Sequence, residues 1–158
     1  MKTNIRKGNI HDMPAVLDLI KELAIFEKEP TAVVSTVHDL ERDGFCDKPL
    51  FYTFVAEINH EIVGVALYYY RYSTWKGKTI HLEDLIVKEN RRGSGCGLAL
   101  YSEIIKQAKL DKVRRVEWNV LNWNQSAIDF YEKSGAKVLH DWSNVQMDEA
   151  GIDAFLSR

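Results

Sequence analysis

A strand-like segment of this chain runs directly into a glycine-rich stretch, and a helix-like segment follows at once. Residues 79–87 are rich in apolar and β-branched side chains, residues 90–97 read NRRGSGCG, and residues 98–110 place apolar side chains at helical spacing. Glycine permits close approach to the backbone, and the first turn of a helix offers unpaired N–H groups with partial positive charge. With Arg91 and Arg92 beside it, the junction favours an anion-binding site over a plain loop that starts a helix.

Two common phosphate motifs do not fit this glycine-rich stretch. A dinucleotide fingerprint needs glycine or alanine at position 98 or 100, where the chain has Leu98 and Leu100. A Walker loop needs a glycine followed by lysine and then serine or threonine, and no glycine of this stretch is followed by lysine.

The rest of the chain alternates between helical and strand periodicity. Strands dominate the middle, with Asn59 and His60 as the turn of a hairpin. Helices are expected near residues 12–30, 35–42, 98–110 and 124–132, and strands near residues 3–7, 51–58, 62–72, 79–87, 115–120, 138–142 and 145–147. This order predicts an α+β fold around a mixed sheet and argues against a doubly wound parallel sheet.

Particular residues near the expected helix ends support these boundaries. Asp12 is expected to cap the first helix, with Pro14 in its first turn, where a missing N–H costs little. Asn124 is expected to cap the helix that follows it. Gly135 lies where a left-handed residue would end that helix.

Composition and charge narrow the class of protein. The chain has 158 residues, 46% of them hydrophobic, which fits one globular domain over residues 1–158. A net charge of -2 gives no support for binding nucleic acid, and no segment approaches the roughly 20 apolar residues of a membrane span. Two distant cysteines and no evident signal peptide favour a cytoplasmic location, and the histidines form no metal pattern. We therefore expect no metal, no nucleic acid and no membrane partner.

The stretch RGSGCG at residues 92–97 resembles the Arg/Gln-x-x-Gly-x-Gly/Ala signature of the GCN5-related N-acetyltransferase (GNAT) superfamily. Five longer segments resemble, in the same order, its diamine (spermidine/spermine) and thialysine acetyltransferase branch: LIKELAIFEKEP, DLERDGF, VGVALYYYRYSTWKGK, HLEDLIV and WNVLNWNQSAIDFYEKSGA. The resemblance implies a single-domain GNAT-like fold, in which helices flank a mixed and mostly antiparallel central sheet. It also implies acetyl-CoA as the acetyl donor.

The resemblance further implies which residues bind acetyl-CoA. In the family the loop cradles the pyrophosphate, the end of the preceding strand pairs with the pantetheine arm, and the start of the last clear helix touches the cofactor. The cofactor is expected to enter where the strand ending at Val87 diverges from the strand near residues 115–120. The implied residues are Leu85, Ile86, Val87, Arg92, Gly93, Ser94, Gly95, Cys96, Gly97, Leu98, Asn124, Gln125, Ser126 and Ala127.

The same resemblance implies that Glu83 acts as the base and Tyr131 as the acid. Glu83 would bind the amine and take its proton through water, and the Tyr131 phenol, with an ordinary pKa of about 10, would protonate the leaving thiolate. Without the resemblance, Glu83 is a hydrogen-bonded strand carboxylate and Tyr131 is a core aromatic beside Phe130. Period-two alternation predicts Glu83 and Asp84 on opposite faces, with His81 on the Glu83 face as a structural residue.

An acidic groove for the acceptor amine is implied by the polyamine branch. The implied substrate-binding residues are Glu27, Trp75, Glu83, Glu117, Trp118 and Asn119. Ser73 stands where polyamine-preferring relatives carry an acid two positions before the tryptophan, which weakens the case for a long polycation. A solvated helix-end charge is the alternative interpretation of Glu27.

The sequence therefore predicts an enzyme that is an acetyl-CoA-dependent N-acetyltransferase. It would transfer the acetyl group to a primary amine of a small molecule by direct attack in a ternary complex. The acceptor would be a diamine, a polyamine or a thialysine-like amino acid. Two alternatives stay open: an acceptor that is a protein N-terminus or lysine, and a non-catalytic module that binds acyl-CoA as a regulatory ligand. The family resemblance also implies a homodimer.

Overall fold

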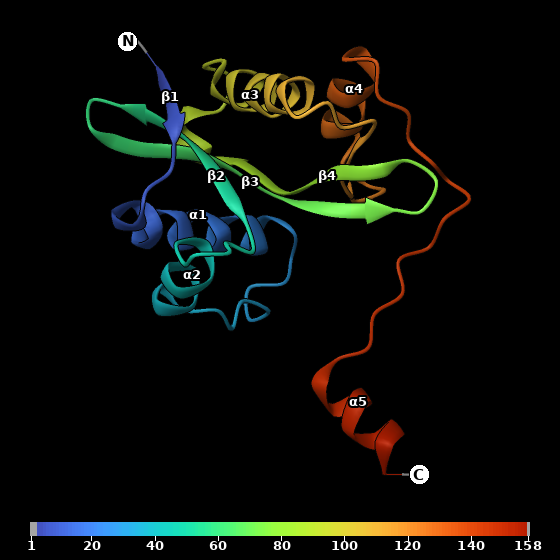
Figure 1. Ribbon diagram of the computed structural model, residues 1–158. Helices are drawn as coiled ribbons and strands as arrows, with labels where there is room; N and C mark the ends of the chain where they lie inside the picture. Colours follow the sequence, from blue (N-terminus) through green and yellow to red (C-terminus); the bar gives the residue numbers. More distant parts are fainter. Residues whose placement is uncertain (1–2, 158) are drawn as a thin grey trace. The chain divides into compact units, whose positions relative to one another are not determined.

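The computed structural model describes residues 3–157 (Figure 1), and the chain divides into two compact units between Asn119 and Val120. The first unit contains β1 (Asn4–Lys7), η1 (Ile10–Asp12), α1 (Met13–Phe26), α2 (Val37–Gly44), β2 (Tyr52–Ile58), β3 (Glu61–Ser73), β4 (Gly77–Val87), η2 (Glu89–Arg91), α3 (Cys96–Leu110) and β5 (Val116–Glu117). The second unit contains α4 (Gln125–Lys133) and α5 (Glu149–Leu156).

The first unit is built around one sheet. Within residues 3–157 its strands follow the order β1-β2-β3-β4-β5. Neighbours from β1 to β4 pair antiparallel, and β4 pairs with β5 in parallel. Helices α1 and α2 lie on one face of the sheet and α3 lies on the other (Figure 1). The predicted α+β fold, with a mixed and mostly antiparallel sheet flanked by helices, is confirmed.

The hairpin of β2 and β3 closes through the predicted turn. Asn59 and His60 have φ angles of 51° and 65°, the left-handed backbone that a two-residue hairpin turn requires. Ile58 and Glu61 pair directly on either side of it. Strands β3 and β4 then extend beyond β2 as an arm, because the β2 pairing ends at Tyr52 whereas β3 continues to Ser73, and β5 pairs with β4 only near the base of this arm.

The main core lies between the sheet and helices α1 and α2. Helix α1 buries one face, since its apolar side chains recur at helical spacing. Its fully or nearly fully buried members meet side chains of α2, β2, β3 and β4; the cluster is Met13, Val16, Leu17, Leu19, Leu40, Val55, Val65 and Ile86. On the opposite face, α3 buries Leu100 and Ile104 completely. The strand β4 is thus held between two packed layers.

Glycine at position 64 lets strands β3 and β4 and helix α3 approach closely. A Cβ added to Gly64 would lie 2.9 Å from the carbonyl oxygen of Ile86 and 3.1 Å from Cδ1 of Leu100. The first of these atoms belongs to the backbone of β4 and cannot rotate away. We expect Gly64→Ala to lower the free energy of unfolding by about 1–3 kcal/mol, as for other over-packed sites.

Denaturant unfolding of this variant beside Gly97→Ala tests that expectation. A Cβ at Gly97 would meet only Cγ2 of Val87, at the ordinary distance of 3.8 Å, and the residue is helical. Gly97→Ala should therefore leave stability unchanged or raise it slightly. Equal midpoints for wild type and Gly64→Ala would show that the approach of β3, β4 and α3 is not tight.

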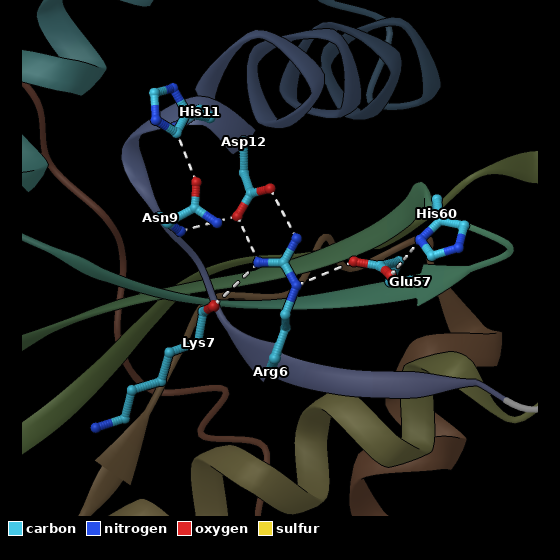
Figure 2. Close-up of polar contacts among 7 residues, drawn as sticks. All are labelled: Arg6, Lys7, Asn9, His11, Asp12, Glu57 and His60. Carbon is cyan, nitrogen blue, oxygen red and sulfur yellow. Dashed lines mark hydrogen bonds and ion pairs between the residues drawn. The ribbon is translucent and has the colours of Figure 1, made fainter.

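An ionic cluster around Arg6 joins β1, β2 and the entry to α1 (Figure 2). Nη1 and Nη2 of Arg6 donate to the two carboxylate oxygens of Asp12 at 2.7 and 2.9 Å, and Nε donates to Glu57 at 3.0 Å. The Arg6 guanidinium holds the pKa of the Asp12 carboxyl below its ordinary value. Paired, bidentate contacts of this kind fix geometry as well as charge.

The same cluster explains why Asp12, which holds the predicted N-cap position of α1, does not cap the helix with its side chain. Asp12 precedes α1, but its side chain makes no capping hydrogen bond to that helix. Its carboxylate instead accepts from the backbone N–H of Asn9 at 2.8 Å and from Arg6. Asn9 caps the preceding turn η1, and Pro14 does lie in the first turn of α1 as predicted.

The carboxyl-terminal part also departs from the prediction. Residues 138–142 and 145–147 form no strand among the described residues, and β5 is limited to Val116–Glu117 rather than residues 115–120. Strand-like composition forms a strand only where a partner completes the ladder. An unpredicted helix, α5, follows instead, and the Asp148 side chain caps it by accepting the Gly151 N–H at 2.8 Å.

Candidate active site

The glycine-rich stretch forms an exposed turn that leads into α3. Gly93 and Gly95 have φ angles of 76° and 85°, a left-handed backbone that favours glycine. The first helical acceptor bond is Ala99 N–H to Gly95 O, at 3.0 Å. The backbone N–H groups of Cys96, Gly97 and Leu98 therefore have no acceptor in the helix. This is the predicted geometry for an anion at a helix N-terminus.

Side chains around the turn leave its outer surface free. The Ser94 hydroxyl donates inward to Arg91 O at 2.6 Å, and the Arg92 Nε donates to Val87 O at 3.3 Å. The Arg92 guanidinium also lies 5.1 Å from the ring centre of Phe26 and stays exposed. Cys96 is 1% exposed and serves as a small core residue.

Strand β4 has one open edge beside this turn. Its parallel pairing with β5 covers only Ile80 with Val116 and His81 with Glu117. From Leu82 to Val87, β4 has no strand on that side in the part of the chain that the structure describes, although β3 covers the other side. Unpaired N–H and C=O groups on a strand edge can pair with an extended ligand. Because β5 ends at Glu117, the predicted divergence of these two strands stays a prediction.

A β-bulge at Glu83 corrects the predicted arrangement of the acidic residues. Leu67 pairs with Asp84 and the next residue, Tyr68, pairs with Leu82, so Glu83 is the extra residue on β4. An extra residue reverses the alternation of faces on either side of it. His81 and Asp84 therefore share the face that carries α1 and α2, and the prediction of opposite faces for Glu83 and Asp84 is wrong.

Glu83 and Asp84 line one cavity of about 340 Å³ on that face. Its walls come from β3, β4, α1, α2 and the loops that flank α2: Ile20, Val33, Ser35, Asp39, Leu40, Asp43, Leu50, Phe51, Leu67, Tyr69, Glu83 and Asp84. Two of the acids, Asp39 and Asp43, already pair with Arg42 at 3.0 and 2.8 Å. No lysine or arginine pairs with Glu83 or Asp84 among residues 3–157, so the cavity has a surplus of negative charge there.

Burial and like charge act together on Asp84. Desolvation raises its pKa to about 6, and the charges of Glu83 and Glu27 add to the shift. Partial desolvation likewise raises the pKa of Glu27, although this side chain still contacts water. Glu83 and Asp84 favour a cation in the cavity, because a nearby positive charge stabilises the ionised form of a carboxyl, and Glu27, which does not line the cavity, adds to the negative charge there.

The raised pKa of Asp84 predicts a pH-dependent cost to stability. A raised folded-state pKa means stability that is complete below the unfolded value of 3.8 and lost as the pH rises through about 6. We expect Asp84→Asn to raise the free energy of unfolding near neutral pH by up to about 3 kcal/mol, with little effect near pH 4. Denaturant unfolding across this pH range measures the difference, with the exposed Asp18→Asn of α1 as control. A gain that is the same at every pH would contradict the assignment.

Glu83 itself is held by two neighbours at the cavity wall. Its side chain is 50% exposed, and Oε2 lies 3.4 Å from Nε2 of the buried His81. Burial is the largest cause that raises the pKa of Tyr69, followed by the charge of Glu83 and a hydrogen bond to it. The phenol of Tyr69 therefore lies near Glu83 and can donate to it. A carboxylate with two potential donors beside it and an open side can accept a further donor from solvent or from a ligand.

The other predicted substrate residues lie in different surroundings. Trp75 is 83% exposed in the turn of the β3–β4 arm. The Glu117 carboxylate contacts Arg71 and Arg115, each at 2.7 Å, so its charge is already offset. Trp118 packs edge-on against Tyr101 of α3, with ring centres 5.7 Å apart. Asn119 is the last residue of the first unit.

The remaining predicted site residues belong to the second unit. Asn124 caps α4, since its side chain accepts the Ala127 N–H at 3.3 Å, and Gly135 has the expected left-handed φ of 96°. Gln125 and Ser126 lie exposed in the first turn of this helix. Tyr131 lies half-buried on α4, with its ring centre 5.3 Å from that of Phe130. Both caps are confirmed.

Sequence reasoning did not assign Asp84 and Tyr69 to the site. Asp84 gave a signal, since it is a second carboxylate in an apolar strand, but period-two alternation assigned it to the wrong face. Tyr69 gave none, because it is one of five aromatic or arginine residues in a row, Tyr68 to Tyr72. Within residues 3–157, no three His, Cys, Asp or Glu side chains are placed to hold a metal ion, and no helix is long and apolar enough to cross a membrane.

Comparisons with known proteins agree with this geometry. The chain is 38% identical over 139 residues to a spermidine/spermine N(1)-acetyltransferase-like protein of Homo sapiens, which covers 84% of this chain but only 20% of that protein. It is 39% identical over 144 residues to a thialysine N-epsilon-acetyltransferase of Bos taurus, covering 85% of this chain and 84% of that protein. The fold matches the solved structure of an integron cassette protein from the mobile metagenome of V. cholerae, with a TM-score of 0.81 at 20% identity over 100% of this chain and 99% of that one.

The family model of the acetyltransferase (GNAT) family matches residues 17–136. This range contains the glycine-rich turn, the open edge of β4, Glu83 with Asp84, and Tyr131. It also crosses from the first unit into the second. The chain therefore belongs to the GNAT acetyltransferase family and is an N-acetyltransferase.

Proposed function

We propose that this enzyme transfers an acetyl group from acetyl-CoA to a primary amine of a small cationic molecule. The observation that carries the proposal is the bulge at Glu83. The bulge directs both Glu83 and Asp84 toward the same cavity. Both residues lie on β4, and the edge of β4 from Leu82 to Val87 has no neighbouring strand on one side among the described residues. The negatively charged cavity suits a cationic amine, and the free edge of β4 suits an extended acyl carrier. Because both features belong to one strand, the two substrates would meet there.

The residues of the first unit fit acetyl-CoA. Three first-turn N–H groups of α3, with the exposed Arg92 and the adjoining Arg91, suit the pyrophosphate. Neither Gly93 nor Gly95 has any atom within 4 Å of a would-be Cβ, so ligand atoms can approach the turn. Leu85, Ile86 and Val87 would offer their backbone to the pantetheine amides. When bound, acetyl-CoA supplies an activated thioester carbonyl.

Glu83 and Asp84 would prepare the amine for attack. A protonated amine has no lone pair, and a primary amine with a pKa of about 10.4 is almost wholly protonated near neutral pH. The carboxylates first attract this cation, and Glu83, which is half-exposed, then takes its proton directly or through water. Asp84, with its pKa raised to about 6, is a stronger base than an ordinary carboxylate, and it is mostly ionised near neutral pH, so its negative charge would attract the cation.

Tyr131 would supply the proton that the departing thiolate needs. A phenol with an ordinary pKa of about 10 is protonated near neutral pH and can donate without a prior step. Tyr131 lies on α4, the helix that Asn124 caps, and the family resemblance assigns both to the cofactor. For that reason we propose that the two units act together as one catalytic domain over residues 1–158.

Thialysine-like amino acids and diamines are the proposed acceptors. The relatives named for thialysine and for spermidine/spermine are 34–39% identical to this chain. Pairing of Asp39 and Asp43 with Arg42 leaves the free negative charge concentrated at Glu83 and Asp84. Negative charge concentrated at one place suits a molecule with one amine at the site better than a long polyamine. The uncharged Ser73, where polyamine-preferring relatives carry an acid, favours the same conclusion.

Thiol release from acetyl-CoA with a panel of amines tests this function. The panel contains thialysine, lysine, putrescine, spermidine and a short peptide with a free N-terminus. Saturable release is expected with thialysine or a diamine, and weaker release with spermidine and the peptide. Preference for the peptide would favour a protein acceptor, and binding of acetyl-CoA without release would favour a regulatory module. We also propose that the protein forms a homodimer, from the family resemblance, and that it is cytoplasmic, from its free cysteines.

A further inference from the structure

We propose that Arg71 and His81 form a positioning pair that fixes the Glu83 carboxylate at the cavity wall, an inference that rests on the function proposed for Glu83. The pair is assigned from a row of contacts that crosses three strands. Arg71 lies on β3, His81 and Glu83 lie on β4, and Glu117 lies on β5. Neither Arg71 nor His81 belongs to the cavity lining, so their effect on the amine would act through Glu83.

The contacts form a continuous row from β5 to Glu83. Nη1 of Arg71 lies 2.7 Å from Oε1 of Glu117 and 3.3 Å from Nδ1 of His81. Nε2 of His81 lies 3.4 Å from Oε2 of Glu83. Arg115 anchors the far end, with Nε 2.7 Å from Oε2 of Glu117. Neither Glu117 Oε1 nor Arg115 Nε makes a directional hydrogen bond among the described residues. The contacts of Glu117 with Arg71 and Arg115 are therefore ion pairs.

Arg71 determines where His81 carries its proton. A guanidinium has only donors, so the Nδ1 that it approaches must be an acceptor without a hydrogen. A neutral imidazole then carries its one proton on Nε2, the atom that faces Glu83. Arg71 thereby makes His81 a donor toward the carboxylate.

The same geometry excludes a proton relay through His81. Nε2 already carries a hydrogen and has no lone pair to accept the proton that Glu83 takes from the amine. A second proton would have to enter at Nδ1, facing the positive charge of Arg71. Burial is the main cause that lowers the pKa of His81, Arg71 lowers it further, and Glu83 and Glu117 oppose them. His81 is therefore neutral near neutral pH.

Two donors then define the direction of the Glu83 carboxylate. From β3, the Tyr69 phenol lies near Glu83 and can donate to it, and its ring also lies against His81 with centres 5.1 Å apart. From β4, His81 offers its Nε2–H. A bulged, half-exposed side chain has many rotamers, and these contacts limit Glu83 to the ones that face the amine. A buried filler at position 81 would supply packing but no such constraint.

Nitrogen NMR of protein labelled at histidine tests the tautomer without any activity measurement. We expect His81 to be a neutral Nε2–H tautomer near neutral pH, and Arg71→Met to make its tautomer mixed or its protonation easier. A neutral Nδ1–H tautomer, or a charged ring, in the wild type would overturn the proposal.

A matched pair of substitutions tests the effect on the amine. His81→Gln places an N–H donor where Nε2 stood, whereas His81→Asn is polar but too short to reach Glu83. We expect His81→Asn to raise the amine KM about tenfold or more, since a donor to a charged group is lost, and His81→Gln to recover most of it. The KM of acetyl-CoA should not change in either variant. His38→Gln, at an exposed position on α2, is the control.

The outcomes separate this inference from the proposed function. Equal amine KM values in the two His81 variants, or a loss that follows melting temperature in both, would make His81 a packing residue only. If wild-type protein releases no thiol with any amine, the proposed function fails, and the tautomer measurement still decides whether Arg71 directs His81.

Discussion

Tyr131→Phe is expected to reduce kcat by about 100-fold or more while the affinity for acetyl-CoA stays within about twofold. The phenol is the proposed donor to the leaving thiolate, and phenylalanine keeps the ring without the hydroxyl. Contact with Phe130, 5.3 Å between ring centres, should survive the change, so α4 should keep its packing. Initial rates of thiol release and calorimetric binding of acetyl-CoA measure the two quantities.

Tyr72→Phe is the matched control for that experiment. Tyr72 is 80% exposed on the β3–β4 arm, so loss of its hydroxyl should leave kcat unchanged. A Tyr131→Phe enzyme with wild-type kcat would remove Tyr131 from the acid role and return it to the alternative of a packing aromatic. Weaker acetyl-CoA binding with unchanged kcat would make it a binding residue.

Glu83→Gln is expected to lower kcat/KM for the amine by about 100-fold near neutral pH, with the KM of acetyl-CoA unchanged. Glutamine is the same size and keeps a carbonyl acceptor for Tyr69 and His81, so the bulge should persist. It cannot take a proton from the amine, and it removes one charge that attracts the amine.

The deficit of Glu83→Gln should shrink as the pH rises toward about 9, because the fraction of free amine in solution then increases about 100-fold over neutral pH. Rates across pH for wild type and variant measure this convergence. Glu149→Gln, an exposed change of the same charge in the first turn of α5, is the control. Equal losses for the amine and for acetyl-CoA at every pH would mean that Glu83 has a structural role.

Periodicity and turn chemistry were sufficient to predict most of the first unit. The β2–β3 hairpin follows from Asn59 and His60, which tolerate a left-handed backbone, and the strand–glycine–helix junction follows from Gly93 and Gly95. These features are local, so a short window of sequence contains their cause. The core face of α1 is predictable for the same reason.

The bulge at Glu83 was not predictable from a strict period of two. HLEDLIV reads as an uninterrupted strand, and only its register with Leu67 and Tyr68 shows the extra residue. That one residue decides whether the two carboxylates face one cavity. The row from Arg71 to Glu83 is hidden for the same reason, since it depends on which residues of three strands lie side by side.

The predicted strands of the carboxyl-terminal segment are absent from the described residues for a different reason. Val145 and Met147 have the composition of a strand, yet both are more than half exposed, and no neighbouring strand pairs with them among the described residues. Composition alone does not supply a partner. Helix α5, by contrast, had a capping signal in Asp148 that sequence analysis overlooked.

The measurement that tests the central claim most directly is thiol release from acetyl-CoA with both acetyl-CoA and thialysine varied, together with mass analysis of the amine. We expect release only when both are present, rates that saturate in each, intersecting double-reciprocal lines, and one acetylated amine for each thiol. Such a result would mean direct transfer within a ternary complex at the cavity of Glu83 and Asp84. Release without amine, or tight acetyl-CoA binding with no acetylated product from thialysine, a diamine or a peptide, would contradict the account.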